Sequence, residues 1–117
     1  MGASTLVFTD AAFDQEVLKS SQPVLVDFWA EGCAPCRQMS PTIDQIGAEY
    51  AGRVKVGKLD VGANIKTATR YQVRGVPTLL VFKGGKVVEQ KVGAVGKADV
   101  KKMLDAHVDA TAPATPK

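Results

Sequence analysis

The chain has 117 residues, 45% hydrophobic and 23% charged, with a formal net charge of +3. This length fits one domain with a substantial hydrophobic core, and the composition argues against disorder of the whole chain. No apolar run approaches the roughly 18–20 residues of a transmembrane helix and no signal peptide is recognisable, so we expect a cytoplasmic protein without membrane contact. The net charge is −5 over residues 1–50 and +8 over residues 51–117, but the lysines are scattered singly. We therefore do not expect nucleic-acid binding.

Hydrophobic periodicity predicts strands that alternate with helices. Residues 6–8 form a short first strand, and Asp10 is placed to cap the helix that follows. Residues 24–29 are a nearly continuous apolar run, which is typical of a strand buried on both sheet faces. A helix then extends to about Tyr50, with a kink at Pro41, because a proline there removes one backbone hydrogen bond.

The second half of the chain continues this alternation. Residues 54–61 are predicted to form a strand and residues 64–71 a short helix. Two apolar runs at 78–82 and 87–92 flank a Lys-Gly-Gly-Lys sequence, which is typical of the turn of an antiparallel hairpin. A last helix begins at Lys97. This order predicts an α/β fold, a central mixed sheet of about five strands flanked by four helices on both faces.

The expected domain organisation is simple. Residues 1–109 form one domain, and residues 110–117, which are rich in alanine, threonine and proline, form a disordered C-terminal tail. We expect the protein to be a monomer.

The two cysteines, Cys33 and Cys36, are too few for a disulfide scaffold. They lie directly after a buried strand and at the start of a helix, where unpaired N–H groups and the helix dipole lower the pKa of a thiol. Because only the thiolate attacks a disulfide, Cys33 is the natural nucleophile. Cys36, one turn further and more buried, is placed to resolve the mixed disulfide. Pro35 stiffens the turn that holds the two sulfurs close.

Two other interpretations of the cysteine pair remain open. Zinc normally takes four ligands, and the single histidine, His107, lies in the last helix, so a zinc site would have to bridge two chains. We expect no metal. Alternatively, both thiols are inert.

Asp27 is a carboxylate in an otherwise apolar strand. The alternation of the strand places it on the same face as Leu25 and Trp29, pointing toward the region beneath the cysteines. Burial would raise its pKa and allow it to exchange protons near neutral pH. In the alternative interpretation it is an acid near a strand end that reaches solvent.

Three segments of the chain resemble the thioredoxin family. Residues 26–37, Val-Asp-Phe-Trp-Ala-Glu-Gly-Cys-Ala-Pro-Cys-Arg, are similar to its active-site segment, residues 75–79 to its cis-proline loop, and residues 92–94 to its substrate-facing glycine turn. The similarity extends from about residue 6 to residue 108. It implies the thioredoxin fold and a protein-disulfide reductase without a bound cofactor. Its partners would be disulfide-containing proteins and an NADPH-dependent thioredoxin reductase that re-reduces it.

The resemblance also assigns roles to further residues. Asp27 is then the proton acceptor that helps to deprotonate Cys36, and Lys58 is the partner of Asp27. Pro77 is the cis-proline that stands opposite the cysteines, although trans is the common state of an X–Pro bond. Val76, the residue before it, offers backbone groups to an extended substrate segment.

Other residues border the expected substrate surface. Trp29 packs beside the active site, Pro35 separates the cysteines, and Gly93 lies in the glycine turn. Gly32 and Ala34 depart from the family, which usually has Trp before the first cysteine and Gly after it. Loss of the exposed aromatic removes contact surface and makes the loop more permissive, so we expect weaker docking to some partners, including a reductase. Ala34 alters the dipeptide between the cysteines, on which the redox potential in this superfamily depends.

Two alternative functions remain at this stage. The first keeps the fold but reverses the chemistry, as a disulfide oxidase or isomerase. The second is a non-redox binding subunit that uses the surface around Val76 and Pro77.

Overall fold

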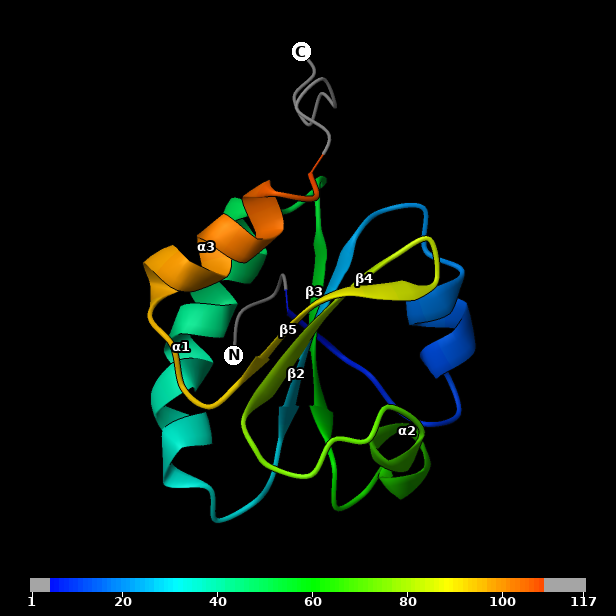
Figure 1. Ribbon diagram of the computed structural model, residues 1–117, viewed down its shortest axis with the longest axis vertical. Helices are drawn as coiled ribbons and strands as arrows, with labels where there is room; N and C mark the ends of the chain where they lie inside the picture. Colours follow the sequence, from blue (N-terminus) through cyan, green and yellow to red (C-terminus); the bar gives the residue numbers. More distant parts are fainter. Residues whose placement is uncertain (1–4, 109–117) are drawn as a thin grey trace.

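Five strands form one mixed sheet in the computed structural model, which describes residues 5–108 (Figure 1). The strands are β1 (Thr5–Val7), β2 (Val24–Trp29), β3 (Lys55–Asp60), β4 (Thr78–Lys83) and β5 (Lys86–Val92). Their order in the sheet is β1-β3-β2-β4-β5, with β3 parallel to β1 and β2, and β4 antiparallel to β2 and β5. The predicted mixed sheet and the β4–β5 hairpin are confirmed.

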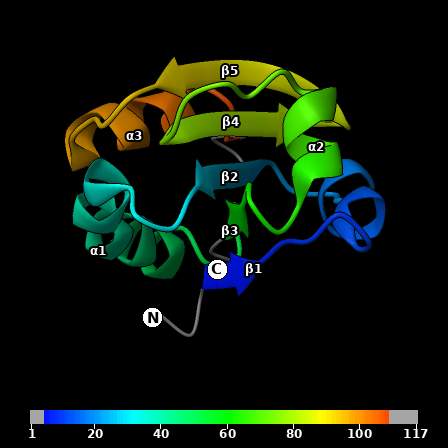
Figure 2. The same cartoon turned by 90° about the horizontal axis from the view of Figure 1, so that it is seen from below.

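Four helical segments cover the two faces of the sheet. They are η1 (Asp14–Leu18), a π-helical turn, α1 (Ala34–Glu49), α2 (Ile65–Arg70) and α3 (Lys97–Asp105). Figure 2 shows α1 and α3 on one face, and α2 and the blue segment that contains η1 on the other. This arrangement confirms the predicted fold class. None of the helices described between residues 5 and 108 is long and apolar enough to cross a membrane.

The central strand β2 is buried on both of its faces. Leu25 belongs to the core cluster that packs beneath α1 and α3, whereas Val24, Val26 and Phe28 belong to the cluster on the η1 and α2 side. Each such side chain contributes about 1.5–3 kcal/mol by leaving water. Because side chains alternate along a strand, Asp27 is directed to the same side as Leu25, toward α1.

The cap predicted for the first helix is wrong. Asp10 does not cap η1, because its carboxylate accepts the main-chain N–H groups of Lys66 and Thr67 in the first turn of α2. The turn that leads into η1 is closed by Thr9 instead, whose Oγ1 accepts the N–H of Ala12 at 3.2 Å. Capping preference is a local property, whereas the approach of Asp10 to α2 depends on how distant segments pack.

The remaining sequence-based boundaries agree with the structure to within one or two residues. Helix α1 includes Pro41 and continues without a break to Glu49, and the kink expected at Pro41 stays a prediction. The predicted tail, residues 110–117, and the end of the predicted domain at residue 109 lie outside the described residues.

Candidate active site

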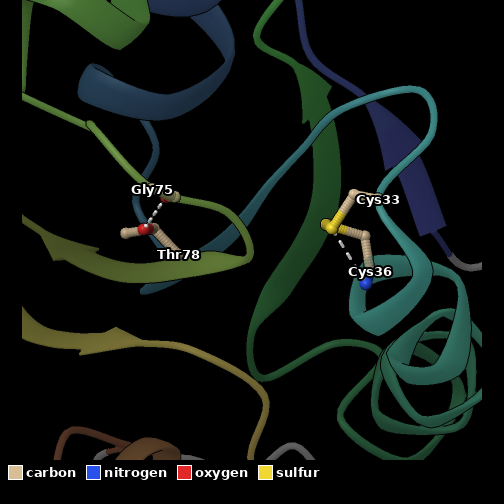
Figure 3. The surroundings of a disulfide bond; sticks show 4 residues. All are labelled: Cys33, Cys36, Gly75 and Thr78. Atoms are coloured by element: carbon tan, nitrogen blue, oxygen red, sulfur yellow. Dashed lines mark hydrogen bonds between the residues drawn. A yellow bond between two sulfur atoms is a disulfide. The ribbon is translucent and has the colours of Figure 1, made fainter.

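Cys33 and Cys36 form a disulfide at the start of α1, with their Cα atoms 5.3 Å apart (Figure 3). Cys33 is the N-cap residue of the helix, and its Sγ accepts the main-chain N–H of Cys36 at 3.1 Å. The side chain of Cys33 is half-buried, whereas Cys36 is only 4% exposed. The accessible sulfur is therefore the one that the helix N-terminus can stabilise as a thiolate, which is the arrangement that a nucleophilic Cys33 requires.

The loop before β4 lies beside the cysteines. The first residue of β4, Thr78, pairs with Phe28 near the end of β2, so the residues that precede β4 and those that follow β2 share one end of the sheet. The Val76–Pro77 peptide bond is cis, which confirms the prediction. Thr78 Oγ1 donates to the carbonyl of Gly75 at 2.6 Å and thereby closes the loop, which bulges toward the disulfide in Figure 3.

A third segment joins this end of the sheet. Gly93 follows β5 with φ +96°, and its N–H donates to the carbonyl of Pro77 at 2.8 Å. Val76 is half-buried, and no main-chain hydrogen bond joins it to another of the residues between 5 and 108. The structure therefore brings together the three segments that the resemblance singled out, and leaves the backbone of Val76 available.

A cavity of about 190 Å³ lies behind the disulfide, and it is large enough for several water molecules. The buried cysteine and the buried carboxyl both line this cavity, together with other side chains of β2, β3 and α1. The lining residues are Asp27, Trp29, Cys36, Arg37, Ser40 and Lys58. Asp27 is 2% exposed, which confirms that it does not reach solvent at a strand end. Burial raises the pKa of Asp27 to about 6. The positive charge of Lys58 lowers this pKa, and the negative charge of Asp44 raises it further.

Lys58 lies opposite Asp27 in the register of β2 and β3. Its ammonium nevertheless donates to Ser40 Oγ at 2.6 Å and forms an ion pair with Asp44 Oδ1 at 3.0 Å, both on α1. Asp27 Oδ1 is buried without a hydrogen-bond partner in the described part of the chain. Lys58 therefore acts on Asp27 through its charge across the cavity, while its direct ion pair is with Asp44.

Sequence reasoning missed the α1 side of this cavity. Ser40 and Asp44 are four residues apart and so share one face of the helix, and Arg37 lines the cavity one turn earlier. The available signal was that Ser40 and Asp44 follow Cys36 at successive spacings of four residues, which places all three on one face of the helix. It does not reveal which residue of the sheet the pair meets.

The residues that depart from the usual pattern are at the exposed rim. Gly32 has φ +83°, and a Cβ built there would meet nothing within 4 Å. Ala34 and Pro35 are exposed in the first turn of α1, and Trp29 is half-buried in the cavity wall. Within residues 5–108, no three His, Cys, Asp or Glu side chains gather as a metal ion would require.

The two sulfurs are arranged for thiol–disulfide exchange, in which they gain and lose electrons as their mutual bond is broken and formed. One sulfur is accessible, and the other is buried at the same cavity as a carboxyl. The fold and the site thus define a thiol–disulfide oxidoreductase. A family model described as Thioredoxin matches residues 4–106, and the chain belongs to the thioredoxin family.

Curated relatives support this assignment over most of the chain. A thioredoxin of Allochromatium vinosum is 50% identical over 99 residues, 85% of this chain and 92% of its own length. A thioredoxin of Pseudomonas aeruginosa is 48% identical over 100 residues, covering 86% and 93%. A thioredoxin of Acidithiobacillus ferridurans is 46% identical over 108 residues, covering 92% and 100%.

Proposed function

We propose that this chain is a protein-disulfide reductase in which Cys33 attacks and Cys36 resolves. The observation that carries the proposal is the position of Cys33 Sγ at the N-terminus of α1, where it accepts the N–H of Cys36. In the reduced protein the same N–H stabilises a thiolate on Cys33, while Cys36 stays buried and protonated.

The reaction proceeds by two exchanges. The Cys33 thiolate attacks one sulfur of a substrate disulfide, forms a bond to it and releases the other sulfur as a thiolate. Cys36 then loses its proton and attacks Cys33 Sγ, which forms the Cys33–Cys36 disulfide and releases the second substrate sulfur. The substrate gains two electrons, and the cysteine pair loses two.

Asp27 receives the proton of Cys36 in the second exchange. The two side chains line one cavity, in which water can connect them. A carboxyl whose pKa is about 6 is a far better base at neutral pH than an ordinary aspartate. The positive charge of Lys58 opposes this rise in the pKa of Asp27, so that the carboxyl is still ionised, and therefore able to accept a proton, at neutral pH.

Substrates dock on the rim of the disulfide. An extended segment binds to the free backbone groups of Val76 beside Pro77, because main-chain hydrogen bonds suit many protein sequences. The surrounding surface is made by residues from the three converging segments and the cavity wall, namely Trp29, Gly32, Ala34, Pro35 and Gly93. No cofactor is bound in this scheme, and electrons come from NADPH through a thioredoxin reductase in the cytoplasm.

Trapping of the mixed disulfide tests the proposal. Cys36→Ser in the reduced state should form a covalent adduct with oxidised insulin, visible on a non-reducing gel and released by dithiothreitol. Cys33→Ser is the matched control and should form none, because Cys36 is buried. A folded Cys36→Ser protein that forms no adduct, or adducts through Cys36 in the control, would contradict the assigned roles.

The reduction potential separates the alternatives. A value near the reference potential of about −270 mV for thioredoxin supports a reductase, whereas about −120 to −180 mV is the range of disulfide oxidases and isomerases. The titration is followed by Trp29 fluorescence, since Trp29 and Cys36 line the same cavity. A non-redox binding subunit would keep its function in the Cys33→Ser/Cys36→Ser double variant.

A further inference from the structure

Lys58 is bound from the α1 side of the cavity. Its ammonium contacts Ser40 Oγ at 2.6 Å and Asp44 Oδ1 at 3.0 Å. The side chains of Lys58 and Asp44 are only 18% and 21% exposed, so solvent screens their attraction less than that of a surface pair. The two contacts come from successive turns of one rigid helix and fix where the positive charge lies.

The same ammonium has a second carboxyl beside it. Asp27 is its neighbour across the β2–β3 pair, and Asp27 Oδ1 is buried without a hydrogen-bond partner among residues 5–108. A buried oxygen of this kind attracts any cation that can reach it, because an unpaired buried polar atom is costly. Lys58 instead points to α1, so its two contacts there outweigh the single contact that Asp27 offers.

Few other charges act on Asp27. Its neighbour on β4 is the apolar Leu79. The charged or titratable side chains that face it come from β3 and α1, and they are Lys58, Cys36, Arg37 and Asp44. Of the two cations, Lys58 is the one that Ser40 and Asp44 hold.

We propose that Ser40 and Asp44 are positioning residues: by binding the Lys58 ammonium they keep it off Asp27, and so leave the Asp27 carboxyl with an oxygen open to the proton of Cys36. This inference rests on the role proposed above for Asp27. The contacts of Ser40 and Asp44 that carry this role are with the Lys58 ammonium. They act through Lys58, and the distance between its charge and Asp27 is what they control.

Release of Lys58 has a definite consequence. An ammonium that is free to pair with Asp27 favours the ionised carboxylate and makes it a weaker base. Asp44→Asn also removes a negative charge that disfavours ionisation of Asp27. Both effects have the same sign, so the pKa of Asp27 falls, by about one pH unit for a charge change at this range. Ser40→Ala removes one contact and leaves Asp44 in place, so the shift is smaller and in the same direction.

The experiment measures the titration midpoint of the Asp27 carboxyl by ¹³C NMR in the oxidised protein. The variants are Ser40→Ala and Asp44→Asn, each made both in the native chain and in a Lys58→Met background. We expect Ser40→Ala to lower the midpoint when Lys58 is present and to leave it unchanged in the Lys58→Met background. Asp44→Asn should lower it in both, and by less without Lys58. Ser40→Thr keeps the hydroxyl and should restore the native midpoint.

A control isolates the pocket from general charge effects on α1. Glu49 is another acid of the helix with two lysine partners, Lys97 and Lys101, so Glu49→Gln should leave the Asp27 midpoint unchanged. A merely structural role for Ser40 predicts the same shift with and without Lys58. Equal shifts in the two backgrounds, no shift, or a rise in the midpoint would each overturn the proposal.

This readout is independent of the proposed function. The titration is measured without substrate, so it reports the position of Lys58 whether or not Asp27 takes a proton from Cys36. Failure of the proposed function would appear instead as a missing Cys36→Ser adduct, or as a rate of mixed-disulfide resolution that is the same in the native and Asp27→Asn proteins. If the proposal holds, the acid limb of the pH profile for resolution moves to lower pH in Asp44→Asn by the same amount as the NMR midpoint.

Discussion

Asp10 caps a helix that begins 55 residues further along the chain: its Oδ1 accepts the main-chain N–H of Thr67 at 2.8 Å. Its Oδ2 accepts the N–H of Lys66 at 3.2 Å, and Asn64 Oδ1 in turn accepts the N–H of Asp10 at 2.8 Å. Because the first turn of a helix has unpaired N–H groups, these contacts join the loop before η1 to the start of α2. We expect Asp10→Ala to accelerate hydrogen exchange at Thr67 selectively.

The cap should also depend on pH. In the folded protein a hydrogen bond with the Thr67 side chain, opposed by desolvation and supported by the main-chain N–H groups of Thr67 and Lys66, lowers the pKa of Asp10. The stability that it contributes is therefore present above the unfolded pKa and is lost as the pH falls through the folded one. Asp10→Asn, which keeps one acceptor oxygen, should retain part of the protection without this pH dependence. Equal exchange rates at Thr67 in native, Asn and Ala forms would contradict the cap.

The ring of Phe8 packs directly on the backbone of Gly57. A Cβ at Gly57 would lie 2.4 Å from the ring edge, and Phe8 is fully buried, so Gly57→Ala must displace the ring within a closed core. We expect this substitution to destabilise the protein by about 1–3 kcal/mol, measured by urea unfolding.

Two variants check this explanation. Gly62→Ala is the control, since a Cβ there meets only Asp60 Oδ1, at 3.4 Å, and it should change the unfolding free energy little. Phe8→Leu combined with Gly57→Ala should cost less than the sum of the two single changes. Additive costs would show that the ring and the glycine do not interact.

Features that depend on residues close together in the sequence could be predicted, whereas those that depend on distant residues could not. Periodicity predicted the order of strands and helices, because each element has its own buried face. The cysteine spacing and the isolated acid in an apolar strand predicted that Cys33, Cys36 and Asp27 belong to one site, because these signals lie within one strand and one helix turn. The structure places the disulfide and the Asp27 carboxyl at one cavity, and the roles of these residues in the reaction stay predictions. The cis bond at Pro77 was expected from the family resemblance and not from the local sequence.

Contacts between distant segments escaped prediction. Asp10 carries the ordinary signature of a cap for the next helix, and only the packing of α2 against the β1–η1 loop redirects it. The contacts of Lys58 with Ser40 and Asp44 likewise depend on how α1 lies across β3. No spacing in the sequence predicts either set of contacts, because the partners come from different elements that are brought together only when the helices pack on the sheet.

Gly32 offers a test of the missing aromatic. Its φ of +83° is a conformation that costs an L-residue about 1–2 kcal/mol, although a side chain there would meet nothing within 4 Å. Gly32→Trp should therefore lower stability and at the same time lower the KM of a thioredoxin reductase for this protein, because it restores apolar contact surface.

The matched control for this change is Gly32→Ala. It carries the same backbone cost at φ +83° without the aromatic ring, so the difference between the Ala and Trp variants isolates the ring. Both should unfold at similarly reduced urea concentrations, and only Trp should improve the KM. Equal KM values in the native, Ala and Trp proteins would show that the reductase does not use this position.

Asp27 should make the stability of the protein fall as the pH rises. Its pKa is about 6 in the folded protein against an ordinary value of 3.8, so the folded state binds the proton more tightly than the unfolded state. The cost of ionising the buried carboxyl therefore appears as the pH rises from about 4 through about 6, and it reaches about 3 kcal/mol above that range. Asp27→Asn removes this cost.

We expect Asp27→Asn to be more stable than the native protein at pH 8, by up to about 3 kcal/mol, and the advantage to shrink toward zero below pH 4. Urea unfolding at the two pH values measures it. Glu31→Gln, at an exposed position, is the control and should show no such pH-dependent gain.

The same Asp27→Asn protein should resolve the mixed disulfide more slowly, because Cys36 has lost its proton acceptor. A gain of equal size at both pH values would mean that the amide packs better and that the buried charge costs nothing. A gain confined to high pH, together with slow resolution, would show that the carboxyl is kept at the expense of stability because the reaction requires it.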